Sequence, residues 1–150
     1  MNRLSTLIIT TLTTLCGCAH LAESNATFTG AANQGAGPLV LRISRHMDTI
    51  VRGPDIDEDQ LLVLELRNFE LNKKLLIPSD NVRATFSVSR FGPSSKGVGN
   101  DGYVIVKSVS DERIVARVNL DVVARTSDGT YTQQVKFRGD HTFYRGRAHE

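Results

Sequence analysis

The sequence predicts an all-β protein, folded as a single antiparallel β-sandwich of about seven strands. Three observations favour this class. From Pro38 onward, apolar and polar residues alternate in short runs, which is the pattern of strands with one buried face. The runs recur about every 10 to 15 residues and are separated by turn-forming residues, as in antiparallel sheets. The chain has 150 residues, which is enough for one domain.

The predicted strands follow one another from residue 39 onward. In chain order the clearest runs cover 39–44, 82–89, 103–106, 114–125 and 135–138. The run 114–125 is the strongest, because an apolar residue occupies every second position from Ile114 to Ala124. The Ser-Asp-Gly at 127–129 predicts a hairpin after it, since Asp-Gly favours tight turns between strands. Turn-forming residues at 78–81 and 110–112 separate earlier runs.

The segment 55–76 is compatible with two structures. It is rich in Leu, Glu and Lys, and Asp55 with Glu58 has the spacing of a helix capping box. The alternation over 61–69 fits a strand equally well. We favour the strand because the other runs are consistently β. The resulting architecture resembles immunoglobulin-like and transthyretin-like sandwiches.

The N-terminus has the organisation of a signal peptide. One positive charge, Arg3, precedes an apolar stretch over 4–15 that is too short to span a bilayer. The sequence Leu15-Cys16-Gly17-Cys18 follows, with an aliphatic residue three positions before Cys18 and a small residue directly before it. This resembles the lipobox of bacterial lipoproteins. The resemblance implies cleavage before Cys18 and a lipid anchor on Cys18.

The same resemblance implies a location on the outer membrane, facing the periplasm. Two or three acyl chains on Cys18 hold a protein durably on a membrane, and Ala19 rather than Asp after the cysteine resembles the outer-membrane sorting pattern. Cys16 is lost on cleavage, so no disulfide is expected in the mature chain. The alternative is an ordinary signal peptide cut near Ala19 or Ala22, which would give a soluble secreted protein.

The residues after the anchor have the composition of a flexible tether. The segment 18–37 is rich in Ala, Asn, Gly, Thr and Ser and has no periodicity. A coil of this length has a reach of roughly 25 Å, which would lift a domain off the lipid headgroups. The predicted organisation is therefore a signal peptide over 1–17, a tether over 18–37 and a β-sandwich domain over 38–150.

The Gly-rich stretch 92–102 is interpreted as a long inter-strand loop. It is not a phosphate-binding loop, because Gly97-Val98 follows Lys96 where that motif needs Ser or Thr after its lysine, and because no helix pattern follows. Binding residues concentrate on loops held by rigid sheets. The possible binding residues of this loop are Ser94, Ser95, Lys96 and Asn100.

Other charged groups are interpreted as solvated surface. The acidic run Asp55–Asp59 has the first half of a calcium loop's spacing, but Gln60 replaces its turning glycine and Leu66 its bidentate glutamate. We expect no metal and no cofactor. We expect the histidines to be surface or loop residues without a chemical role. They are His20, His46, His141 and His149. Near the C-terminus, cations and aromatic rings occur together, and we interpret them as a final strand with a solvated face. The alternative is a surface that contacts headgroups, peptidoglycan or an acidic partner. The residues are Arg138, Arg145 and Arg147 with Phe137, Phe143 and Tyr144.

The expected function is that of a lipid-anchored, non-catalytic binding or accessory module of the cell envelope, with a possible envelope protein as partner. No enzyme is expected, since the mature chain offers no thiol nucleophile and no G-x-S-x-G elbow. Nucleic acid is not an expected partner, because 18 basic and 16 acidic residues leave a net charge of only +2. The alternatives are a small-ligand carrier with a cavity between the sheets and an envelope hydrolase that uses Asp, Glu and His.

Overall fold

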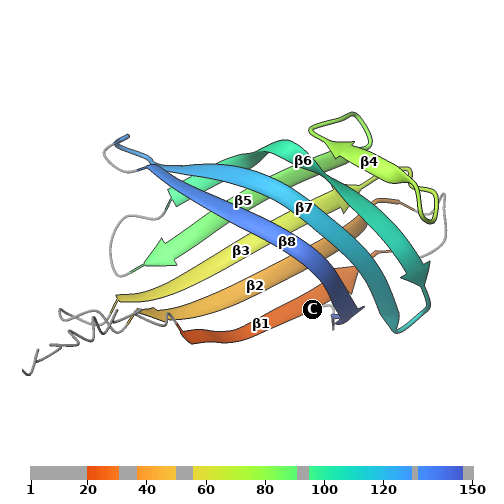
Figure 1. The fold of residues 1–150 in the computed structure, drawn as a ribbon, viewed down its shortest axis with the longest axis horizontal. Coiled ribbons are helices and arrows are strands. Elements are labelled where there is room, and N and C mark those ends of the chain that lie inside the picture. Colours follow the sequence, from red (N-terminus) through yellow and green to blue (C-terminus); the bar gives the residue numbers. More distant parts are fainter. Residues whose placement is uncertain (1–19, 31–36, 50–55, 91–94, 130–131, 147–150) are drawn as a thin grey trace, which may run out of the picture.

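The computed structural model describes residues 20–30, 37–49, 56–90, 95–129 and 132–146, and the regular elements among them are all strands (Figure 1). The eight strands are β1 (His20–Thr29), β2 (Leu39–Thr49), β3 (Ile56–Leu66), β4 (Lys74–Ile77), β5 (Val82–Arg90), β6 (Ser95–Val109), β7 (Arg113–Thr126) and β8 (Thr132–Arg145). The predicted runs at 39–44, 82–89, 103–106, 114–125 and 135–138 all lie in strands, so these predictions are confirmed.

The strands form one sheet that closes into a seven-stranded barrel (Figure 1). Their order is β6-β5-β3-β2-β1-β8-β7, and β7 pairs back onto β6 to complete the ring; β4 pairs with β6 as a branch. The predicted β-sandwich is therefore wrong. Alternation with a period of two shows only that each strand buries one face, which a sandwich and a barrel satisfy equally. The pairing of β1 with β8 and of β6 with β7 decides between them.

The inner wall of the barrel is the hydrophobic core. In β7 the burial alternates along the whole strand, and the side chains from Ile114 to Ala124 that point inward are fully buried. The ring of Phe137 on β8 meets that of Phe86 on β5 edge to face, with centroids 5.7 Å apart. Because β5 and β8 lie on different sides of the barrel, this contact between their phenylalanines shows that side chains fill the barrel interior.

Strand β6 bends sharply where it changes partners. Its first residues pair with β5 and its later ones with β4. A side chain at Gly99 would place its Cβ 2.7 Å from the Cβ of Ala84, and one at Gly102 would overlap the carbonyl oxygen of Asn119. The glycines therefore let β6 approach its neighbours closely at the bend. The predicted loop over 92–102 is wrong for 95–102, which belongs to β6. The glycines that allow the close approach of β6 to its neighbours also weaken the strand pattern in the sequence.

Strand β1 lies inside the segment predicted to be a tether. It pairs antiparallel with β2 from His20↔Asp48 to Thr29↔Val40, and Phe28 is fully buried in the core. The tether prediction therefore does not hold for His20–Thr29. The small polar residues of β1 carry no alternation of their own, and tertiary pairing with β2 overrides their weak strand propensity.

The ambiguous segment after residue 55 is a strand as far as Leu66, so the strand prediction is confirmed and the helix alternative is wrong. The predicted end at Phe69 is three residues too late, because the chain leaves the sheet after Leu66 and Phe69 packs into the core from the loop that follows. We call the end of the barrel at which β1 and β8 begin the proximal end. The end that carries this loop and the β6–β7 turn is the distal end (Figure 1).

Candidate functional site

The four predicted binding residues do not form one surface. Ser94 lies outside the described residues. Ser95 is buried, whereas its neighbour Lys96 is exposed on the outer wall, as is Asn100. Lys96 and Asn100 flank Val98, whose side chain is 58 % exposed over shallow hollows of the outer wall. This surface is small, and nothing in the structure shows what would cover it.

The barrel is incompletely closed between β1 and β8. These parallel strands are paired at Thr27↔Tyr144 and Phe28↔Arg145, although β1 has 10 residues and β8 has 14. From these pairs the two strands run apart toward the proximal end (Figure 1). We call this opening, between 20–26 of β1 and 132–143 of β8, the seam. Within the described part of the chain, no ladder joins the two strands along it.

The backbone of β8 offers hydrogen-bonding groups to the seam. In an antiparallel strand, the N–H and C=O of one residue point to the same side, and successive residues alternate. The carbonyl of Lys136 accepts a hydrogen bond from Arg45 Nη1 across the seam (3.3 Å), and Gly146 N–H donates to Phe28 (2.9 Å). Even-numbered residues of β8 therefore face β1, while odd-numbered residues face β7. Apart from the carbonyl of Lys136, the even residues 134–142 form a strand edge that no described strand pairs with.

Arg45 is the side chain that bridges the seam. It occupies the inward phase of β2, and its guanidinium lies 4.1 Å from the centroid of the Phe137 ring. Burial lowers the pKa of Arg45. No carboxylate of the described residues lies within ion-pair distance of it. Among the described residues, this half-buried cation contacts a carbonyl and a ring, and its guanidinium has further N–H donors for another acceptor.

His141 lies on β8, in the same inward phase as Phe137. It is half-buried, its Nε2 atom is inaccessible to solvent and has no hydrogen-bond partner among the described residues, and its ring stands 6.1 Å from that of Phe143. Burial is the main cause that lowers the pKa of His141, and the charge of Arg45 lowers it further. The balance of these effects favours the neutral form of the imidazole.

Polar side chains line the interior between the seam and the opposite wall. Gln133 Nε2 on β8 donates to Glu58 Oε1 on β3 at 3.1 Å, and Gln60 Nε2 donates to the same oxygen at 2.6 Å. Glu58 and Gln60 are only 7 % and 3 % exposed. Since β3 and β8 are not neighbours, the bond from Gln133 crosses the barrel. These three side chains thus place a polar cluster inside the proximal part of the barrel, next to buried apolar residues such as Val88 and Val135.

Sequence reasoning missed these residues, although a signal for them exists. On β2, Arg45 is the next inward-facing position after the buried apolar residues 39, 41 and 43. On β3, Gln60 is the inward-facing position before the buried apolar residues 62, 64 and 66. Gln133 likewise precedes the inward phase of Val135 and Phe137. If each alternating apolar pattern is extended by one more inward-facing position, the extension reaches Arg45, Gln60 and Gln133. We take the seam with Arg45, His141 and Phe137 as the candidate functional site.

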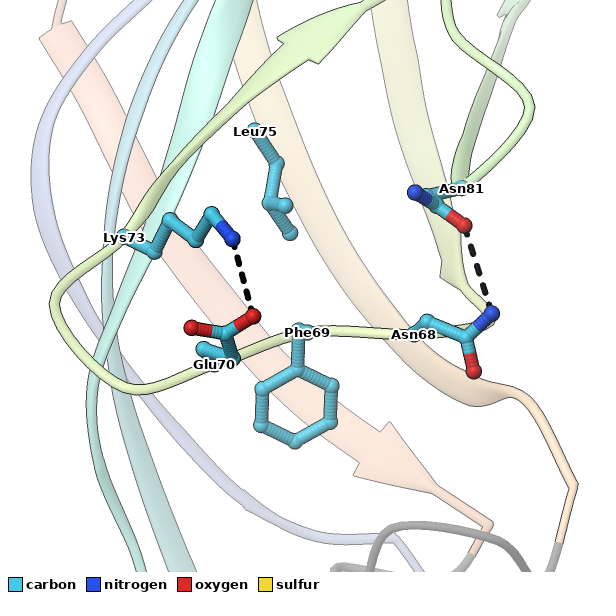
Figure 2. Close-up of a pocket in the computed structure, with 6 residues that line it drawn as sticks. All are labelled: Asn68, Phe69, Glu70, Lys73, Leu75 and Asn81. Carbon is cyan, nitrogen blue, oxygen red and sulfur yellow. Dashed lines mark hydrogen bonds and ion pairs between the residues drawn. The ribbon is translucent and has the colours of Figure 1, made fainter.

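A hollow of about 220 Å³ lies at the distal end (Figure 2). Its walls come from the loop after β3, where Lys73 Nζ pairs with Glu70 Oε1 at 2.8 Å and Asn68 donates to Asn81 at 3.3 Å. Phe69 fills the space beneath this loop and is 8 % exposed. The polar groups of the loop satisfy one another, which fits a loop that closes the barrel end.

The remaining predicted candidates are scattered over the molecule. His46 faces outward and hydrogen-bonds Asp59 at 2.7 Å, while His149 lies outside the described residues. The run predicted as a solvated acidic turn is a strand from Ile56 onward, with Glu58 inside the barrel and Asp59 outside. No group of three metal-ligating side chains occurs among the residues that the structure describes.

The C-terminal cations and rings do not form a common patch. Phe137 and Phe143 are fully buried, whereas Arg138 pairs with Asp121 on the outer wall. Arg145 stacks 5.0 Å from the centroid of Phe28, and Arg147 lies outside the described residues. Strand alternation separates the rings from most of the cations, so the alternative of one mixed surface does not hold.

His141 makes the stability of the barrel depend on pH. Because its pKa is lowered in the folded state, the unfolded chain binds the proton more tightly. The contribution of His141 is therefore full above the unfolded pKa of about 6.5, and it is lost as the pH falls from there through the lower pKa of the folded state. We expect the urea midpoint to fall between pH 7.5 and 5 by more in the wild type than in His141→Gln. Equal losses in the two proteins would contradict this role.

Comparison with protein-family models, with curated proteins and with solved structures finds no match. The described segments contain no helix with the length and apolar character needed to cross a bilayer. The assignment of a function therefore depends on the residues of this chain alone.

Proposed function

We propose that the protein is a lipid-anchored, non-catalytic binding module of the cell envelope, which holds an extended segment of a partner protein as an added strand in the seam. The observation that carries the proposal is the short pairing between β1 and β8, limited to Thr27↔Tyr144 and Phe28↔Arg145. An unpaired strand edge is a ready template for another chain. The anchor is Cys18, on the strength of the lipobox-like sequence around it.

The odd number of strands in the barrel favours insertion of a further strand between β1 and β8. Seven strands that alternate in direction cannot close a ring without one parallel pair, and that pair is β1 with β8. An eighth strand between them would run antiparallel to both. The outward N–H and C=O groups of residues 134–142 would then gain partners, which supplies affinity through main-chain hydrogen bonds.

The side chains around the seam favour a binding role over the alternatives. His46 and His141 lie on the outer and inner faces of the wall, so they do not share the cleft that a hydrolase would need. The middle of the interior is filled by rings such as Phe137 and Phe86, which leaves less support for a ligand carrier. Arg45 and His141 would instead give the seam selectivity for the side chains of an added strand.

Lys136→Pro tests the proposal, because it removes an N–H group that faces the seam and leaves the ladder with β7 intact. Lys136→Ala, which keeps the N–H, is the matched control. In intact cells, a photo-crosslinking residue at Thr142 should give a specific adduct with an envelope protein. We expect the proline variant to lose this adduct and the alanine variant to keep it.

A crosslinker at Arg83, which is exposed on β5 away from the seam, is the control for crosslinks that form by chance encounter and not by binding in the seam. The urea midpoints of both Lys136 variants establish that the barrel is intact. The strand-addition proposal fails if Thr142 gives no adduct, if the adduct persists with proline, or if Arg83 gives the same adduct.

A further inference from the structure

Strand β1 begins close to the proposed anchor. Its first residue, His20, is two residues after Cys18. An extended chain spans at most about 3.6 Å per residue, so the acylated residue and the barrel are no more than about 7 Å apart. The flexible tether of the sequence prediction would have allowed roughly 25 Å. With β1 in the barrel wall, the anchor holds one end of the barrel at the bilayer surface.

We infer that the barrel stands on the membrane by its proximal end, with lipid headgroups as the contacting surface. This inference rests on the proposed acylation of Cys18. Among the residues that the structure describes, exposed polar or charged side chains of both signs lie at the proximal end: Asp59, Lys96, Arg125, Ser127 and Asp128. These side chains are suited to contact with hydrated headgroups.

The distal end then projects well away from the bilayer. Strand β7 has 14 residues, which at about 3.3 Å per residue and a strand tilt of about 40° give a barrel height of roughly 35 Å. The β6–β7 turn at 110–112 and the hollow beneath the loop after β3 lie at that height. Any partner that reaches the distal end approaches from the aqueous side.

The competing arrangement lays the barrel on its basic outer wall. Outward cations on β6, β7 and β8 include Lys107, Arg117 and Arg138. However, Lys107 and Arg117 both pair with Asp140, at 2.7 and 2.8 Å, and Arg138 pairs with Asp121. These pairs reduce the charge that the wall presents to anionic lipids, so the short anchor decides the orientation.

An upright barrel places the wide part of the seam next to the bilayer. The paired part, at Thr27↔Tyr144, is distal, and the opening widens toward the proximal end. A segment that enters the seam therefore starts near the membrane surface. This narrows the proposed partner to a protein whose extended segment lies directly beside a membrane.

Fluorescence quenching at single cysteines tests the orientation. The chain has two cysteines, of which Cys16 would be lost on cleavage and Cys18 blocked by acylation, so one introduced thiol is labelled alone. The probes are Ser127→Cys at the proximal end and Asp111→Cys at the distal end, in acylated protein on phosphatidylcholine vesicles that carry a nitroxide on the headgroup. We expect the fluorophore at 127 to be quenched severalfold more strongly than that at 111.

Equal quenching at the two positions would overturn the upright orientation, and so would stronger quenching at 111. Mass spectrometry of the same samples reports acylation separately. A chain without acyl groups would defeat the proposed anchor and this inference together. An acylated chain with equal quenching would defeat the orientation only. Adding phosphatidylglycerol to the vesicles tests the basic wall, since quenching at 111 that rises with anionic lipid would show the barrel lying flat.

Discussion

Phe137→Ala is expected to lower the free energy of unfolding by about 4 kcal/mol. Phe137 is fully buried, meets Phe86 edge to face at 5.7 Å and carries the guanidinium of Arg45 above its ring. Its removal leaves a cavity in the middle of the barrel and deprives Arg45 of its apolar support. The loss is a large part of the roughly 5–15 kcal/mol that stabilises a domain of this size. Urea denaturation followed by circular dichroism measures it.

Tyr144→Ala is the matched control, since Tyr144 is an aromatic residue of the same strand whose side chain is 61 % exposed. It should change the free energy of unfolding by no more than about 0.5 kcal/mol. Phe137→Leu keeps most of the buried volume and should fall between the two. If Phe137→Ala were no more destabilising than Tyr144→Ala, the ring would not lie in a packed interior.

Cys18→Ser is expected to abolish acyl labelling and to release the protein from the membrane fraction. A hydroxyl group cannot form the thioether that lipobox-like sequences imply, and no other cysteine remains after cleavage. Two or three acyl chains give durable attachment, so their loss should change the distribution almost completely. Labelling with a radioactive or alkyne-bearing fatty acid, followed by fractionation, measures both effects.

Cys16→Ser is the control for the same experiment. It removes the other thiol of the segment, which the proposal places in the cleaved peptide, and should leave both labelling and membrane retention unchanged. Retention of the Cys18→Ser variant in the membrane fraction would contradict the lipid anchor, and so would loss of labelling in Cys16→Ser.

The strands were predictable where one face is apolar. The runs at 114–125 and 82–89 have regular alternation, and both are strands whose inward residues are buried. The closure of the sheet was not predictable from them. It depends on which strand edges meet, and on glycines such as Gly99 and Gly102 that allow β6 to bend. Alternation along one strand contains no information about either.

Two parts of the chain were misread for related reasons. The residues of β1 are small and polar, and their strand depends on pairing with β2. The Gly-rich start of β6 has the composition of a loop, yet it lies between β5 and β7. At the candidate site, the contacts of Arg45 with Lys136 and Phe137 require β2 and β8 to come together through closure of the barrel, which no local sequence pattern describes.

The pairing of the first strand with the last has a kinetic consequence. Thr27 and Tyr144 stand near opposite ends of the described chain, so their contact closes a long loop and carries a high entropic cost. The antiparallel neighbours β6, β7 and β8 join through short turns and are expected to form earlier. Ring closure at the seam would then be the last event of folding and the first contact to open when the native barrel fluctuates. The edge on which an added strand would depend is thus the part of the wall that the chain holds least firmly by its own contacts.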